Sequence, residues 1–208
     1  PRSRAQAHDS SHTIVGRPAQ LGGGPPADDV WELSLTRAPT WRKLPIAGRR
    51  PGLRGGHGGV YDPIADQFVI LGGWVADFGD VANDCWTLSA DSIPTWTKRA
   101  DIGAFFRGST DFAFPTLTYD TARHRVVAFR TGAYPTWTLF GRASSGGTWW
   151  ALDPGYWDPV MPSNRIQSPV IYDPLRDRVV IAGGEGQSGA ILYNDTRAFT
   201  WGAPKRDV

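Results

Sequence analysis

The stretch YDPIADQFVILGG at residues 61–73 returns as YDPLRDRVVIAGG at residues 172–184. Each copy holds a Tyr-Asp turn, a short apolar strand and a pair of glycines. A third copy starts at Tyr119-Asp120, continues with an apolar strand at 126–129, and ends in Thr131-Gly132 instead of two glycines. These strands are apolar at consecutive positions, so both of their faces must be covered, as when sheets stack face against face.

A second, aromatic strand follows the glycines of each copy. Asp29-Val30-Trp31 matches Asp84-Cys85-Trp86, and Trp41 and Trp96 each lie ten residues further on. In the third copy Trp149-Trp150 fits the slot of this strand, and in the fourth copy Ile191 and Tyr193 occupy it. The string TRAPTW at 36–41 also returns as TRAFTW at 196–201. Pro135-Thr136-Trp137 falls out of register, so we place it in a loop.

These matches divide the chain into four units at about 4–47, 50–100, 103–161 and 165–205, and an arginine opens each unit. The 208 residues include 25 Gly and 17 Pro, which predict many turns and short elements, and no window has a helical period. We therefore expect each unit to form four short strands. Repeats of this length that cannot bury their own faces imply an all-β propeller or array.

The order of these motifs resembles the kelch repeat. Residues 50–99 match best, with Arg54-Gly55-Gly56-His57, the Tyr-Asp turn, the double glycine, Asp84-Cys85-Trp86 and Trp96 in sequence. The resemblance implies a β-propeller of four blade-like, four-stranded repeats. Because kelch propellers usually have five to seven blades, we expect the chain to be part of a larger propeller, with a closed four-bladed ring as the alternative.

Composition and charge exclude several classes of function. The net charge is +2 and no run of Lys or Arg exceeds two residues, so no nucleic-acid footprint is expected. A single cysteine excludes an intramolecular disulfide, and no apolar stretch is long enough to predict a membrane span. These features do not determine the cellular compartment of the protein. The first residue is Pro1, which fits a processed or cut chain, and the motif style resembles bacterial kelch proteins, which are often exported.

We expect binding residues where the repeat is interrupted, because loops on a rigid scaffold carry recognition. Three long loops hold aromatic and arginine side chains: Trp74 and Phe78; Tyr134, Trp137, Phe140 and Arg142; and Tyr156. The alternative is that these aromatics fold down and cap the blades.

The arginines that open the units are separate candidates: Arg4, Arg54, Arg107 and Arg165. The kelch resemblance places such arginines near the mouth of the central channel, where they would suit a carboxylate or phosphate. The alternative is that each pairs with a neighbouring blade's carboxylate or with backbone carbonyls.

The sequence thus favours a non-catalytic scaffold that binds a protein or glycan partner on one face, without a metal or another cofactor. Two alternatives remain. The resemblance to galactose oxidase, a kelch propeller with a copper centre and a Tyr–Cys crosslink, suggests a copper oxidase in which Cys85 is reactive. Otherwise Cys85 is a small buried residue in the slot of Val30. The aromatic loops also suit a carbohydrate-binding propeller.

Overall fold

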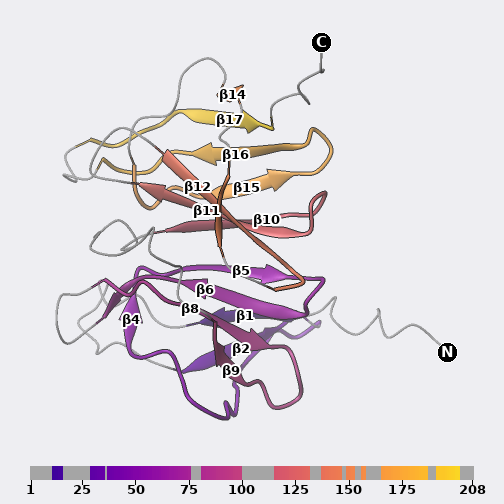
Figure 1. Cartoon of the computed structure of the whole chain (residues 1–208). Coiled ribbons are helices and arrows are strands. Elements are labelled where there is room, and N and C mark those ends of the chain that lie inside the picture. Colours follow the sequence, from indigo (N-terminus) through magenta and orange to yellow (C-terminus); the bar gives the residue numbers. More distant parts are fainter. Residues whose placement is uncertain are drawn as a thin grey trace.

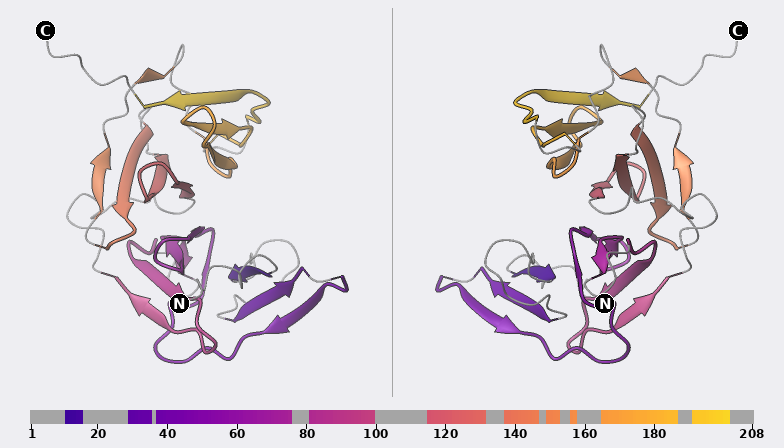
Figure 2. Two further views of the ribbon diagram at one scale, coloured as in Figure 1. Left: turned by 90° about the vertical axis from the view of Figure 1, so that its right-hand side faces the viewer. Right: turned by 90° about the vertical axis from the view of Figure 1, so that its left-hand side faces the viewer.

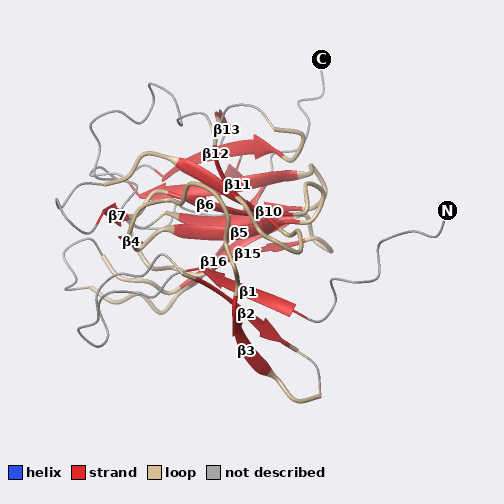
Figure 3. Ribbon diagram, turned by 90° about the horizontal axis from the view of Figure 1, so that it is seen from below, coloured by secondary structure: helices blue, strands red, loops and turns tan. Residues whose placement is uncertain are grey.

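The computed structural model describes residues 11–15, 29–35, 37–75, 81–99, 115–131, 137–146, 149–152, 156–157, 165–186 and 191–201. Within these ranges every regular element is a strand, as Figure 3 shows. The expected all-β class is therefore confirmed. Arg4, Arg107, Phe78 and Tyr134 lie outside the described residues.

The first half of the chain forms two antiparallel sheets and a short ribbon. Sheet 1 has the order β1 (Ser11–Val15), β2 (Val30–Ser34), β3 (Thr40–Lys43). Sheet 2 has the order β5 (Gly58–Asp62), β6 (Gln67–Leu71), β8 (Cys85–Ser89), β9 (Trp96–Lys98). The ribbon pairs β4 (Arg54–Gly55) with β7 (Trp74–Val75).

The second half forms two further four-stranded sheets. Sheet 3 has the order β10 (Thr116–Asp120), β11 (Arg125–Thr131), β12 (Trp137–Ala143), β13 (Trp150–Leu152). Sheet 4 has the order β15 (Val170–Asp173), β16 (Arg178–Ala182), β17 (Thr196–Thr200), β14 (Tyr156–Trp157). Its outermost strand thus comes from a segment that precedes its first strand.

Sheets 2, 3 and 4 follow one another in chain order and stack face against face (Figure 1), and sheet 1 lies next to sheet 2 at the end of the row (Figure 2). The first strands of sheets 2, 3 and 4 are neighbours, because β10 contacts both β5 and β15. The two side views show that the sheets fan out along an arc (Figure 2). The described part of the chain is an open arc, not the closed four-bladed ring of the alternative.

Three apolar clusters hold the arc together, one between each pair of neighbouring sheets. The cluster between sheets 1 and 2 contains Val30, Ile70, Trp86, Leu88 and Trp96. Between sheets 2 and 3 lie Val69, Leu71, Cys85, Leu117, Tyr119, Val126, Ala128 and Trp149. Between sheets 3 and 4 lie Val127, Phe129, Val179, Ile181 and Phe199. The expected face-to-face stacking is therefore confirmed.

Strand geometry explains why the second strands are apolar at consecutive positions. Successive side chains of a strand point to opposite faces. In β6, Ile70 packs toward sheet 1, whereas Val69 and Leu71 pack toward sheet 3. In β11, Val126 packs toward sheet 2 and Val127 toward sheet 4. Each of these strands thus supplies two interfaces.

The Tyr-Asp motif closes the hairpin between the first and second strands. Asp62 and Asp173 each accept hydrogen bonds from two backbone N–H groups of the turn. The turns end in Asp66 and Asp177, which adopt φ values of 48° and 45°. The tyrosine hydroxyls donate to these two carboxylates, with Tyr172 lying 2.6 Å from Asp177. The repeat tyrosines thus help to fix the turns of sheets 2 and 4.

The turn of sheet 3 differs at one residue. His124 occupies the left-handed position, with φ of 49°, where the other two turns have aspartate. The Tyr119 hydroxyl instead lies 2.8 Å from the Ser144 hydroxyl.

The structure corrects four assignments of the repeat. Trp150 begins β13, the fourth strand of sheet 3, and not the third. The third strand of sheet 4 is β17, which begins at Thr196 and not near Ile191 and Tyr193. TRAFTW therefore spans a third strand, whereas TRAPTW leads into the outer strand β3. Residues 156–157, placed in the third unit, pair with β17 of sheet 4.

Three of the four errors involve the outer strands β3, β13 and β14. Outer strands pair on one side only, so their sequences carry a weaker repeat signal than the second strands do. In sheet 3 the segment Trp137–Ala143, expected to be a loop, forms the long third strand β12. The aromatic pair Trp149-Trp150, expected in the third strand, therefore coincides with the start of the outer strand β13, which pairs with β12.

Truncating an interface residue should destabilise the arc. Phe129 is almost completely buried between sheets 3 and 4. Phe129→Ala should lower the free energy of unfolding by about 3–5 kcal/mol, because it removes apolar contacts and leaves a cavity. Urea unfolding followed by tryptophan fluorescence measures the change. The exposed Leu175→Ala is the control and should stay within about 0.5 kcal/mol of the parent. Equal effects of both changes would contradict the stacked arrangement.

Candidate functional site

The candidate site lies at the end of the sheets where the glycine pairs stand. In sheets 2 and 4 the second strand runs into Gly72-Gly73 and Gly183-Gly184, all with positive φ. A Cβ on Gly73 would lie 2.8 Å from the Gly55 carbonyl oxygen, and one on Gly184 would lie 2.9 Å from that of Ile166. Only glycine allows this close approach of two backbone segments. The pairs are thus structural, and they bring the opening segment of each unit onto the strand end.

Arg54 and Arg165 stand on these opening segments and make the same set of bonds. Arg54 donates to both carboxylate oxygens of Asp84, with one contact of 3.2 Å, and to the Gly72 carbonyl at 3.1 Å. Arg165 donates likewise to Asp195, with one contact of 3.2 Å, and to the Gly183 carbonyl at 3.0 Å. The guanidinium of Arg165 also stacks 4.1 Å from the ring centre of Tyr193.

The carboxylates of these pairs are held in the charged form. Burial by itself raises the pKa of Asp84, but the hydrogen bonds and charge of Arg54 outweigh it and lower the pKa. Hydrogen bonds from Arg165 and Arg197 hold the pKa of Asp195 well below its usual range. Each arginine therefore clamps its glycine pair to the start of the third strand of its own sheet. The aspartate comes from the same sheet, not from the neighbouring one.

Both guanidiniums are buried, so they do not line an open site. Of the aromatic candidates, Trp74 is 37% exposed and follows the first glycine pair in β7. In sheet 4 the corresponding end carries the exposed Ile191 and Leu192, and Leu192 bridges to Glu185. This end of the molecule thus presents apolar side chains to solvent.

The structure does not support the loop placement of four other candidates. Trp137, Phe140 and Arg142 lie in β12, and Tyr156 lies in β14. Arg142 is 2% exposed, and its Nε and Nη1 atoms have no hydrogen-bond partner among the described residues. Burial lowers the pKa of Arg142. Residues 137–143 contain Gly141 and do not alternate, so the local sequence carried no clear signal for this strand.

Cys85 lies in the interface between sheets 2 and 3 and is completely buried. Burial raises the pKa of its thiol to about 11, so the thiol is protonated at neutral pH. This position fits the interpretation of Cys85 as a small packing residue. Among the described residues, no group of three His, Cys, Asp or Glu side chains is placed to hold a metal ion.

An ion-pair network joins sheets 3 and 4 at the opposite end, where the hairpin turns lie. Arg123 donates two hydrogen bonds of 2.7 Å to Asp177 across the interface. Arg123 and Arg125 both lie over the ring of Trp201, at 5.2 and 4.2 Å from its centre. The bonds from Arg123 lower the pKa of Asp177 to about 2. The network holds the turn of one sheet against the next.

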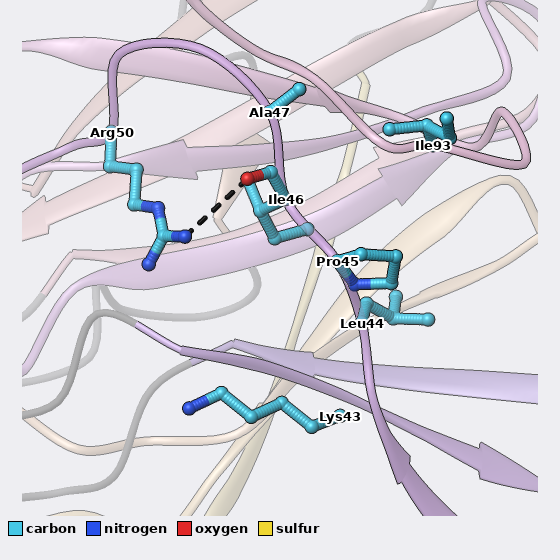
Figure 4. Close-up of a pocket in the computed structure, with 7 residues that line it drawn as sticks. All are labelled: Lys43, Leu44, Pro45, Ile46, Ala47, Arg50 and Ile93. Atoms are coloured by element: carbon cyan, nitrogen blue, oxygen red, sulfur yellow. Dashed lines mark hydrogen bonds between the residues drawn. The ribbon is translucent and has the colours of Figure 1, made fainter.

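A shallow groove of about 580 Å³ lies where the chain passes from sheet 1 to sheet 2. Figure 4 shows Leu44, Pro45 and Ile46 between the cationic side chains of Lys43 and Arg50. Arg50 donates to the Ile46 carbonyl, and Lys43 forms an ion pair with Asp29 at 3.5 Å. Both cations therefore already have partners. Sequence reasoning did not single out this groove.

The described residues contain no helix long and apolar enough to cross a membrane.

No protein-family model matches the sequence, and no curated protein sequence is significantly similar to it. Solved structures do match. One is a chain of the RAG complex bound to one melted and one unmelted RSS, with a TM-score of 0.61 and 12% identity over 91% of this chain. Another is a fungal alcohol oxidase of the AA5 family in complex with copper, with a TM-score of 0.55 and 16% identity over 85% of this chain.

This chain spans 60% of the RAG-complex chain and 36% of the oxidase chain. At such low identities the matches show the fold alone. Together with the stacked sheets they support a β-propeller-like fold.

Weakening one arginine clamp should destabilise sheet 2. Lysine at position 54 cannot bond both oxygens of Asp84 and the Gly72 carbonyl together, because it lacks the planar fork of arginine. Arg54→Lys should lower the free energy of unfolding by about 1–3 kcal/mol, measured by urea unfolding at pH 7. The control is Arg42→Lys, which alters an exposed pair with Glu32 and should have no measurable effect.

The same pair gives stability a pH dependence. The pKa of Asp84 is lower in the folded chain than in the unfolded one, so its contribution is present above about pH 4 and is lost on acidification. Unfolding of the parent at pH 7, 4 and 2.5 should show this loss, and Arg54→Lys should lose less. An identical acid response in both proteins would contradict the clamp.

Proposed function

We propose that the chain is a kelch-type portion of a larger propeller and acts as a non-catalytic interaction scaffold. Its protein or glycan partner would dock at the end of the sheets that carries the glycine pairs. The observation that carries this proposal is the exposure of apolar side chains there. Trp74, Ile191 and Leu192 are exposed on the segments that follow the two glycine pairs.

Strand pairing and hydrogen bonds hold the backbone of these exposed residues in place, and a rigid backbone favours recognition of a partner. Trp74 pairs with Gly55 in the ribbon β4–β7, directly beside the clamped Arg54. Glu185, at the corresponding place in sheet 4, bridges to Ile166 and Leu192 and accepts a hydrogen bond of 2.6 Å from Gln167. Exposed tryptophan on a rigid segment is the kind of residue that dominates binding energy. The buried arginines would then support the docking surface instead of contacting the partner.

The docking role of Trp74 can be tested with a displayed random-peptide library and a glycan array as probes. We expect a binder whose affinity falls at least about tenfold in Trp74→Ala, because an aromatic anchor is removed. Ile64→Ala is the matched control, since Ile64 is exposed on the hairpin turn at the other end of sheet 2. Binding that persists in Trp74→Ala but is lost in Ile64→Ala would contradict the proposal, because it would locate the docking surface at the hairpin-turn end of the sheets.

A copper measurement separates the scaffold from an oxidase. After incubation with Cu²⁺ and dialysis, the scaffold should retain no stoichiometric copper, and Cys85→Ser should bind the same peptide or glycan as the parent. One copper per chain, together with oxidase activity that disappears in Cys85→Ser, would overturn the non-catalytic proposal.

A further inference from the structure

Arg142 occupies a position of the repeat that is apolar in sheets 2 and 4. In sheets 2, 3 and 4 the tyrosine of the Tyr-Asp turn begins a row of paired residues that crosses the first three strands. The third strand contributes Leu88 to this row in sheet 2 and Phe199 in sheet 4, and both are almost completely buried. In sheet 3 the third strand contributes Arg142. A charged side chain therefore stands where packing alone calls for an apolar one.

The guanidinium of Arg142 lies between sheets 2 and 3. Arg142 pairs with Val126, and directly paired residues of an antiparallel sheet lie on the same face. Val126 belongs to the apolar cluster that sheet 3 forms with sheet 2, so Arg142 points toward sheet 2 as well. Arg142 is only 2% exposed. Bulk water therefore has almost no access to this charge.

Two hydrogen-bond donors of this guanidinium are unused. In the part of the chain that the structure describes, the Nε and Nη1 atoms of Arg142 are buried and have no hydrogen-bond partner. The indole Nε1 of Trp149, which belongs to the same interface, has none there either. Arg54 and Arg165 are also buried, but each bonds both oxygens of a carboxylate. A buried cation without such a partner is strongly destabilising, so this interface requires an acceptor.

The charges around Arg142 do not balance. Burial has the largest effect on the pKa of Arg142 and lowers it, and the groups that act on it electrostatically are Cys85, Arg99 and Asp62. The thiol of Cys85 has a pKa of about 11, so it is protonated and uncharged at neutral pH. Two guanidiniums then stand against one carboxylate. One positive charge is left over.

Neither charged neighbour neutralises Arg142 directly. Arg99 is half-buried and donates to two neutral side chains, those of Thr87 at 2.8 Å and Gln67 at 3.0 Å. Asp62 accepts two backbone N–H groups of its turn through Oδ1, and its Oδ2 atom has no hydrogen-bond partner among the described residues. A water molecule at Arg142 would accept a hydrogen bond but would leave the excess charge in place. An anion supplies both the acceptor and the charge.

We propose that the interface between sheets 2 and 3 binds a small monovalent anion, of the halide class, at the unpartnered donors of Arg142. One excess positive charge matches one monovalent anion. The ligand must be small, because the neighbouring Val126 and Cys85 are completely buried. The site lies inside the stack of sheets, so this proposal is independent of the docking surface at Trp74.

The chloride dependence of unfolding tests this proposal. Urea unfolding of the 208-residue chain is measured at pH 7 over a series of sodium chloride concentrations, with sodium gluconate added to keep the ionic strength constant. A ligand that binds only the folded state stabilises it by mass action. The equilibrium constant for unfolding should therefore fall about tenfold for each tenfold rise in chloride once the site is mostly filled. Gluconate, a large organic anion, should not replace chloride.

Arg142→Met separates the site from general effects of salt. Methionine removes the guanidinium but keeps a long apolar side chain, which suits a position that holds Leu88 and Phe199 in sheets 2 and 4, so the variant should fold. Its unfolding should not depend on chloride. Arg42→Met is the matched control, because it removes an exposed arginine from the outer strand of sheet 1 and should keep the chloride dependence of the parent.

Crystals of the parent grown in sodium bromide give a readout that needs no variant. Anomalous scattering should locate one bromide beside the guanidinium of Arg142, between sheets 2 and 3. Three results would overturn the proposal: an equal response of unfolding to chloride and gluconate, a chloride response that persists in Arg142→Met, or a bromide-free interface at Arg142. None of them bears on the binding of a peptide or glycan at Trp74.

Discussion

The arc depends on one physical constraint: its second strands are apolar on both faces, so each needs a sheet on either side. Val69 and Leu71 are fully buried against sheet 3, and Ile70 is buried against sheet 1. No single sheet can satisfy such a strand, which is why the repeats are stable only as a stack. Each of these strands begins after a Tyr-Asp turn and, in sheets 2 and 4, ends at a glycine pair held by an arginine clamp. These features fix the ends of the strands, so that neighbouring sheets can pack against them.

The sequence was most informative where local chemistry and burial act together. The stretches 61–73 and 172–184 predicted two hairpins, because the Tyr-Asp turn, the apolar strand and the glycines each require a particular backbone geometry. The same residues also predicted that the sheets stack, since a strand that is apolar at consecutive positions has no face to turn to water. The all-β class followed from these segments without any information on the outer strands.

The outer strands could not be predicted in the same way. Trp150 was assigned one strand too far inward, and Tyr156 was placed in a loop although it joins sheet 4. Strand β14 is held by a partner far along the chain, and no local pattern reveals such a pairing. The candidate arginines show a similar limit. Their spacing identified Arg54 and Arg165 as equivalent, but only the coordinates show that a carboxylate of the same sheet engages each of them.

The alternation of side chains along β6 and β11 has a consequence for how the sequence can vary. Val126 and Val127 are adjacent in the chain but belong to different interfaces, whereas Val127 and Val179 belong to one interface although they lie in different sheets. Stability in such a stack approximates a sum of nearest-neighbour terms. Substitutions at adjacent residues should therefore behave independently, and covariation should connect residues about fifty positions apart. The packing unit of this chain is thus the interface between two sheets, to which two different repeats contribute.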